Sequence, residues 1–111
     1  MKHYQAFMTA IGMVTLGCVA ACAPTAVPPE KTQIVMNEFM FVPMGLNIKA
    51  GSTVTWTNKD NEPHTVVSDT GVFRSGAIDT NEQFSFKFDK PGTYHFTCSI
   101  HPRMVGTIIV R

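Results

Sequence analysis

The sequence has few charged residues and no clear helical pattern. Charged side chains make up 15% of its 111 residues, and the formal net charge is +1. There is no cluster of Lys and Arg of the kind that binds nucleic acid, and no acidic run that would favour a basic partner. No stretch repeats apolar residues at the spacing of about 3.6 that is typical of an amphipathic helix. We therefore expect neither a nucleic-acid partner nor a helical fold.

Cysteine is also scarce, with only three residues in the chain. Cys18 and Cys22 lie in an apolar N-terminal segment, so Cys98 is the single cysteine of the remaining sequence. In an oxidising compartment Cys98 would then have no partner for an intramolecular disulfide. A bound metal ion would give this thiol a function.

The N-terminal segment has the features of a secretory signal. Residues 1–21 carry Lys2 and then 16 mostly apolar residues, a stretch shorter than the ~20 residues of a comfortable membrane span. Val19-Ala20-Ala21-Cys22 resembles the lipobox of bacterial lipoproteins, in which the cysteine is lipidated and becomes the new N-terminus. A buried helix of the fold or an uncleaved anchor helix is the alternative interpretation.

Cleavage before Cys22 would leave residues 22–31 as a proline-rich linker and residues 32–111 as one domain. The basic and acidic side chains of this mature part are equal in number. We expect a monomer exported to the periplasm or the outer cell surface. A lipid on Cys22 would tether it to a membrane.

From residue 32 onward, short runs of β-prone residues alternate with turn residues. Val54 and Trp56 would share one face of a strand, as would Phe84, Phe86 and Phe88. Strands with one apolar and one polar face predict two sheets packed together, so we expect an antiparallel β-sandwich. The expected strands are Gln33–Glu38, Leu46–Ala50, Thr53–Asn58, His64–Ser68, Gln83–Phe88, Gly92–Thr97 and Val105–Val110.

The segment that follows the predicted strand Gly92–Thr97 holds three possible metal ligands. Cys98, His101 and Met104 bring a thiolate, an imidazole and a thioether into one short loop. A second imidazole would complete the ligand set of blue-copper electron-transfer sites, a trigonal His2Cys plane with a long axial Met. His64 is the candidate because it follows Pro63 at the start of a predicted strand and can lie at the same end of the sandwich.

Strand alternation separates Cys98 from the nearby His95. Cys98 would face the interior together with Tyr94 and Phe96, whereas His95 would face solvent. A second group of soft ligands, the residues Met36, Met40 and Met44, could suggest a Cu(I)-scavenging site. Their spacing crosses strand and loop without a tight cluster, so we interpret them as core or surface packing.

Most of residues 32–111 resembles the plastocyanin-like and amicyanin-like branch of the cupredoxins. The short ligand loop is similar to that of amicyanin, whereas plastocyanins and azurins have longer loops. The resemblance rests on five pieces: Phe41-x-Pro43, Gly51-x-x-Val54-x-Trp56-x-Asn58, His64-Thr65-Val66, Gly92-Thr93-Tyr94-x-Phe96-x-Cys98 and His101-Pro102-x-Met104-x-Gly106.

The resemblance implies an eight-stranded Greek-key sandwich that binds one copper ion at one end through His64, Cys98, His101 and Met104. It further implies that electrons pass through the exposed edge of His101, inside an apolar patch. Local candidates for this patch are Met44, Pro63 and Pro102. Thr65 departs from the family pattern, because amicyanin and azurin place Asn after the first ligand histidine. A threonine hydroxyl can make a similar bond with less reach.

Three functions compete for this ligand set. A one-electron carrier would exchange electrons with redox proteins, such as a cytochrome, a dehydrogenase or an oxidase, that dock near His101. A copper-handling protein would instead bind copper and pass it on. A copper enzyme needs further histidine-rich centres, but apart from the two ligand histidines the predicted domain contains only His95. We therefore expect a carrier, with copper handling as the alternative, and no catalytic activity.

Overall fold

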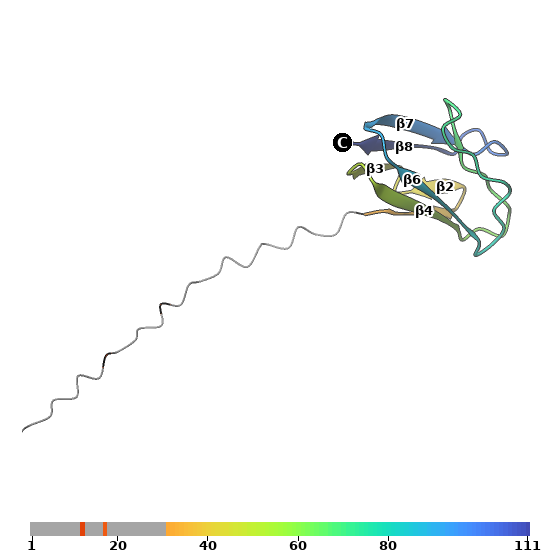
Figure 1. The fold of residues 1–111 in the computed structure, drawn as a ribbon. Helices are drawn as coiled ribbons and strands as arrows, with labels where there is room; N and C mark the ends of the chain where they lie inside the picture. Colours follow the sequence, from red (N-terminus) through yellow and green to blue (C-terminus); the bar gives the residue numbers. More distant parts are fainter. Residues whose placement is uncertain (1–11, 13–16, 18–30) are drawn as a thin grey trace, which may run out of the picture.

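A computed structural model describes residues 31–111, together with Gly12 and Gly17. The predicted signal segment, Cys22 and all but the last residue of the predicted linker lie outside the described residues. In the described part, eight strands form two four-stranded sheets packed face to face (Figure 1). No helix in this part is long and apolar enough to cross a membrane. The all-β sandwich is therefore confirmed.

The two sheets differ from a purely antiparallel arrangement. Strand β1 (Gln33–Asn37) runs parallel to β4 (Ser52–Asn58), and β3 (Gly45–Ile48) runs parallel to β8 (Val105–Val110). The other neighbouring strands are antiparallel. Parallel neighbours arise because the chain crosses between the sheets, and a crossover can return a strand in the same direction. One sheet has the order β2-β1-β4-β6, with β1 Gln33–Asn37, β2 Met40–Val42, β4 Ser52–Asn58 and β6 Gln83–Phe88. The other has the order β3-β8-β7-β5, with β3 Gly45–Ile48, β5 Val67–Ser68, β7 Gly92–Thr97 and β8 Val105–Val110.

Two strands differ clearly from the sequence-based expectation, whereas β1, β3 and β4 differ only by one or two residues at their ends. Strand β2 was not predicted, because three residues before Pro43 are too short to show an alternating pattern. The predicted strand His64–Ser68 shrinks to β5, Val67–Ser68. His64 forms only an isolated bridge with Ile78, and the backbone N–H of Val66 donates to the Ser75 hydroxyl instead of to a strand. His64 therefore lies in a connection outside the regular sheets.

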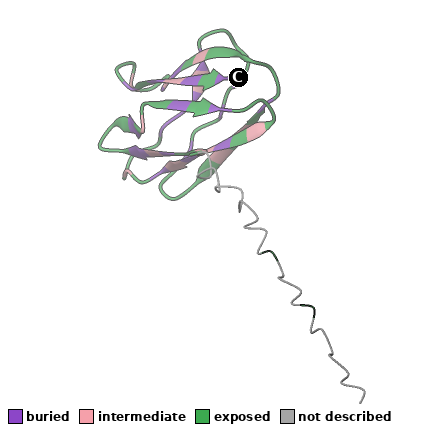
Figure 2. Ribbon diagram, turned by 90° about the vertical axis from the view of Figure 1, so that its left-hand side faces the viewer, coloured by how far each residue is buried: buried purple, intermediate pink, exposed green. Residues whose placement is uncertain are grey.

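Trp56 lies at the centre of the core between the sheets. It is fully buried, and its ring lies 5.5–6.4 Å from the rings of Phe73, Phe84, Phe88 and Phe96. Figure 2 shows buried and exposed residues alternating along the strands, as the sequence pattern predicts. Burying each large side chain contributes about 1.5–3 kcal/mol, so this aromatic cluster gives the sandwich a rigid interior.

The connections at one end of the sandwich carry the candidate ligands. The loop between β7 and β8 contains Cys98, His101 and Met104, and the connection after β4 contains His64. In Figure 1 these connections lie at the end of the molecule opposite the C-terminus. The fold therefore brings together ligands that are more than thirty residues apart in sequence.

Candidate metal centre

Three possible ligand atoms converge at this end of the sandwich. The Nδ1 atoms of His64 and His101 lie 3.1 Å apart. The Cys98 Sγ lies 3.9 Å from His64 Nδ1 and 3.7 Å from His101 Nδ1. His64 and Cys98 are fully buried and His101 is partly exposed, so the cluster lies just beneath the surface.

These separations suit a trigonal metal ion. Metal–nitrogen and metal–sulfur bonds of about 2.0 and 2.3 Å place trigonal ligands about 3.5 Å apart for N···N and about 3.7 Å for N···S. The observed 3.7 and 3.9 Å match the second value, and 3.1 Å is somewhat shorter than the first. A thiolate and two imidazoles favour copper or zinc over calcium or magnesium. The residues therefore fit copper without a large change of geometry.

Asp60 fixes the orientation of His64. The His64 Nε2 lies 2.7 Å from Asp60 Oδ2. A carboxylate can only accept, so Nε2 carries the proton and Nδ1 keeps a free lone pair that points towards Cys98 and His101. Asp60 thereby selects the tautomer that a metal ligand needs.

Asp60 also anchors the turn between β1 and β2. Its carboxylate accepts hydrogen bonds from the backbone N–H groups of Glu38 at 2.7 Å and Phe39 at 3.0 Å. Burial raises the pKa of Asp60, but the bonds from Phe39, His64 and Glu38 outweigh it and hold the pKa below its usual value. Glu38 and Phe39 both have left-handed backbones, with φ of 52° and 58°, and the carboxylate helps to hold this costly conformation.

The anchored turn places Phe39 over both histidine ligands. Its ring meets His64 edge-on at a centroid distance of 5.5 Å and His101 at 5.0 Å. Phe39 is itself about half exposed, so it covers the histidines while contributing to the surface. On the far side of His101, the Glu62 carboxylate lies 3.6 Å from Nε2.

Thr65 joins the His64 segment to the Cys98 loop. Its hydroxyl oxygen accepts from the Ser99 N–H at 2.8 Å and lies 2.7 Å from the Ser99 hydroxyl. Ser99 can donate both of these bonds, which leaves the Thr65 hydroxyl free to donate to Cys98 Sγ at 3.8 Å. The Thr65 hydroxyl therefore reaches far enough to connect the two ligand segments, although Thr65 stands where amicyanin and azurin place Asn.

The Cys98 sulfur is held ready for ionisation. Burial raises the pKa of the thiol, but hydrogen bonds from the Thr65 backbone, the His101 side chain and the backbones of Ile100 and His101 lower it by more. The Thr65 N–H lies 3.4 Å from Sγ. A lowered pKa favours the thiolate, which is the metal-binding form of cysteine.

Met104 is buried beside this cluster. Its carbonyl accepts from the Cys98 N–H at 3.0 Å, and its N–H donates to the His101 carbonyl at 2.9 Å. These two bonds close the loop on itself, so the spacing Cys-x2-His-x2-Met returns Met104 next to its starting point. Met104 thus lies near the three converging atoms, and its role as an axial ligand stays a prediction.

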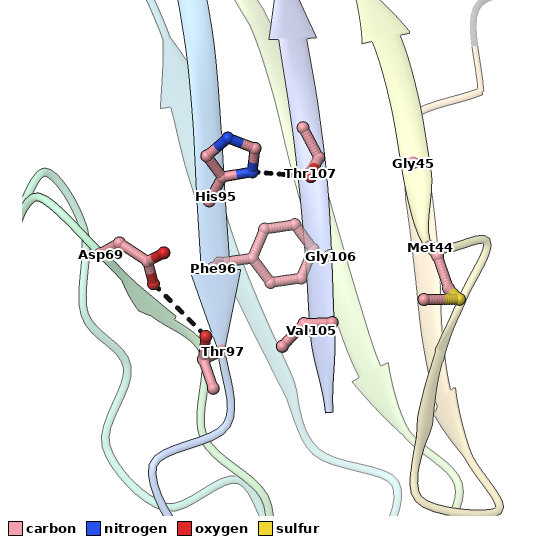
Figure 3. A pocket seen from close by; sticks show the side chains of 9 residues that line it. All are labelled: Met44, Gly45, Asp69, His95, Phe96, Thr97, Val105, Gly106 and Thr107. Atoms are coloured by element: carbon pink, nitrogen blue, oxygen red, sulfur yellow. Dashed lines mark hydrogen bonds between the residues drawn. The ribbon is translucent and has the colours of Figure 1, made fainter. Parts of the chain in front are cut away.

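His95 lies outside the cluster, as strand alternation predicts. It is exposed on the outer face of the β7/β8 pair, and its Nδ1 lies 2.9 Å from the Thr107 hydroxyl (Figure 3). In the same view Thr97 donates to Asp69, and these groups line a shallow surface pocket away from Cys98.

Three residues that matter for the site were not predicted from the sequence. The sequence predicts no more than a turn around Asp60, and Phe39 precedes β2, which the sequence does not predict. Asn58 is buried and organises the connection by donating to the Glu62 and Ile78 carbonyls and accepting from the Asp60 N–H. A carboxylate four residues before a ligand histidine is the one sequence signal that could have pointed to Asp60.

Comparisons with known proteins agree with this site. Residues 8–110 match the family described as "Cupredoxin-like domain". The chain is 33% identical over 122 residues to amicyanin-alpha of Methylorubrum extorquens, covering 96% of this chain and 98% of that protein. It is 39% identical over 85 residues to plastocyanin of Scenedesmus fuscus, covering 65% of this chain and 87% of that protein.

The fold comparison gives the same answer. A solved structure of a variant amicyanin in its Cu(I) form superimposes with a TM-score of 0.68 at 27% identity, covering 71% of this chain and 80% of that one. Together with the geometry of His64, Cys98 and His101, these matches show a site for one copper ion with Met104 nearby. The chain therefore belongs to the cupredoxin family.

Proposed function

We propose that this cupredoxin is a blue, type 1 copper protein that carries single electrons between redox partners at a membrane surface. The observation that carries the proposal is the convergence of His64 Nδ1, His101 Nδ1 and Cys98 Sγ, with Met104 buried beside them. This is the ligand set of blue-copper electron-transfer sites, with Met104 as the weak axial ligand.

The residues around the ligands suit electron transfer because they hold the ligands in place independently of the metal. Bound copper supplies the one-electron couple, and the protein supplies a fixed coordination geometry. Asp60 fixes His64, Thr65 ties the two ligand segments together, and the backbone bonds of Met104 close the loop. A preorganised site of this kind changes little between two oxidation states.

The surface around His101 is the proposed route for the electron. The His101 side chain is 26% exposed, whereas His64 is fully buried. A shallow pocket of about 350 Å³ beside His101 is lined by Phe39, Ile100 and Pro102, among others. Exposed apolar residues that surround a single histidine edge suit brief docking of a redox protein such as a cytochrome, a dehydrogenase or an oxidase. Met44 and Pro63 are also exposed and extend the candidate patch.

Reconstitution with Cu(II) tests the copper assignment. We expect an intense blue visible band that disappears in Cys98→Ser, because the band requires the thiolate. Met104→Leu should keep a blue band and raise the reduction potential, since a thioether that donates to Cu(II) is lost. A pale or colourless Cu(II) complex of the unmodified protein would refute the type 1 assignment.

We further propose that the protein is an exported lipoprotein, with residues 1–21 removed and lipid attached to Cys22. The lipobox-like segment supports this proposal. Fractionation of cells that express Cys22→Ala tests it, and the altered protein should leave the membrane fraction. Retention in the membrane would instead indicate that the N-terminal segment acts as an anchor.

A further inference from the structure

Three methionine residues meet at one small pocket beside the metal centre. Met40 begins β2, Met44 precedes β3, and Met104 belongs to the ligand loop. All three line a pocket of about 50 Å³ together with Phe39, Arg103 and Val105. Met36 is fully buried in the core, as its interpretation as core packing predicts, and Met104 instead of Met36 lies at this pocket.

The three methionines differ in their exposure to solvent. Met40 and Met44 are 49% and 51% exposed, whereas Met104 is only 2% exposed. Half-exposed methionines add little to a core, so core packing does not explain why residues 40 and 44 are methionines. Figure 3 shows the Met44 side chain extending towards the end of the sheet where Val105 begins β8. That is the end of the sandwich that carries the ligand loop.

The pocket directly adjoins the copper site. Met104 belongs to both, since its backbone is bonded to Cys98 and His101. Phe39 also belongs to both, because it lines the pocket and its ring contacts His64 and His101. The pocket and the histidine and cysteine ligands are therefore neighbours that share Phe39 and Met104.

The chemistry of the pocket selects soft monovalent cations. No carboxylate or imidazole lines it, and thioethers suit Cu(I), whereas oxygen ligands suit magnesium, calcium and manganese. Arg103 also lines the pocket, and its positive charge repels divalent ions more strongly than monovalent ones. The same charge weakens the binding of Cu(I), which favours a site that passes the ion on.

We propose that Met40, Met44 and Met104 form a Cu(I)-binding site at the surface, from which the ion moves to His64, Cys98 and His101. Cu(I) would bind the neutral thioethers without oxidation, reduction or release of a proton. At the inner site it would replace the proton of the Cys98 thiol. The binding step stands by itself, and the transfer step rests on the copper function proposed above.

The binding step is tested with Ag(I), a redox-inert ion with the same soft preference as Cu(I). The full chain would carry Cys18→Ser and Cys22→Ser, and one equivalent of Hg(II) would occupy Cys98. Methyl NMR should show saturable shifts of Met40, Met44 and Met104 while the core Met36 signal stays unchanged.

Two matched variants separate the thioethers from simple apolar packing. Met40→Leu/Met44→Leu keeps the surface apolar and should weaken Ag(I) binding at least about tenfold, as loss of even a residue that only supports a ligand does. Val42→Leu/Val72→Leu changes two similarly exposed apolar residues outside the ligand loop and should leave the binding unchanged. Unchanged Ag(I) affinity in the methionine variant, or no NMR shift of the Met40 and Met44 methyl groups, would overturn the proposed site. The methionines would then form an apolar patch only.

The transfer step is measured as the rate at which the metal-free protein withdraws Cu(I) from bicinchoninate, followed by the loss of colour of the chelate. The double methionine variant should be several-fold slower than the Val42→Leu/Val72→Leu control, with Cu(II) uptake equal in both. Equal Cu(I) rates would refute the transfer role. A colourless Cu(II) protein would refute the type 1 assignment alone, because neither the NMR nor the chelate measurement depends on a blue band.

Discussion

Removal of the Asp60 carboxylate should destabilise the metal-free protein. In Asp60→Ala, the His64 Nε2 and the N–H groups of Glu38 and Phe39 lose the acceptor that they share. Hydrogen bonds to a charged group contribute about 1.5–3 kcal/mol each, but water can replace the carboxylate at the two exposed backbone groups. We therefore expect a loss of about 2–4 kcal/mol, most of it from the buried His64.

Urea unfolding followed by fluorescence provides the measurement, because Trp56 is the single tryptophan and is fully buried. With an m value of about 1 kcal/mol/M, the unfolding midpoint should fall by roughly 2 M or more. Asp89→Ala is the matched control, since this carboxylate is 71% exposed and contacts only Lys87 at 3.5 Å. Its effect should stay within about 0.5 kcal/mol.

The copper site supplies a second readout for the same residue. Asp60→Asn retains one carbonyl acceptor but no longer selects the His64 tautomer, so copper affinity should fall about 10–100-fold while most of the fold is kept. If Asp60→Ala is as stable as Asp89→Ala and Asp60→Asn binds copper normally, the carboxylate neither anchors the turn nor orients His64.

Three further predictions concern Thr65, Gly106 and the pH dependence of the Asp60 contribution to stability. Thr65→Val removes a hydroxyl donor to Sγ, so the pKa of Cys98 should rise, which ultraviolet absorbance of the thiolate measures. An unchanged pKa would mean that the backbone donors and the His101 side chain lower it without the hydroxyl. Gly106→Ala places a methyl group 2.7 Å from a ring carbon of Phe96 and should cost about 1–3 kcal/mol in thermal unfolding, whereas a neutral effect would mean that the ring can move freely. Because the pKa of Asp60 is lowered in the folded state, its stabilisation is complete above the ordinary value of 3.8 and is lost as pH falls through the lower folded-state pKa. Asp60→Asn should flatten stability in that acid range, and an unaltered pH profile would contradict this.

The sequence predicted the sheets well where alternation is long. Strands β6, β7 and β8 have the predicted bounds, because polarity alternates along β6 and β7 and β8 is an uninterrupted run of mostly β-prone residues. The strand prediction failed where a strand is very short or where backbone bonds outside the sheets replace strand pairing. Strand β2 has only three residues, and the run from His64 leaves the sheet because its backbone bonds to residues 75 and 78 instead. The parallel pairs could not be predicted, since pairing partners depend on crossovers that polarity patterns do not record.

The ligands could be predicted from the sequence, whereas the residues that orient them could not. Cys98, His101 and Met104 fall within seven residues, so their chemistry is visible in one short segment. Asp60 acts on a turn 22 residues earlier in the chain, and Thr65 acts on a loop 34 residues later. Hydrogen bonds between such distant segments leave no local pattern in the sequence.

This separation has a consequence for how the site forms. The bonds from Asp60 and Thr65 exist only after the sheets have packed and brought the connections to one end. Both bonds are made between protein groups, so the ligand atoms already lie 3.1–3.9 Å apart before any metal binds. In the metal-free protein the Nδ1–H of His101 can bond to His64 Nδ1 or to Cys98 Sγ, so a proton among the three ligand atoms helps to hold them together. A bound copper ion would take the place of that proton, and because it binds ligands that only the folded chain brings together, copper should stabilise the folded state.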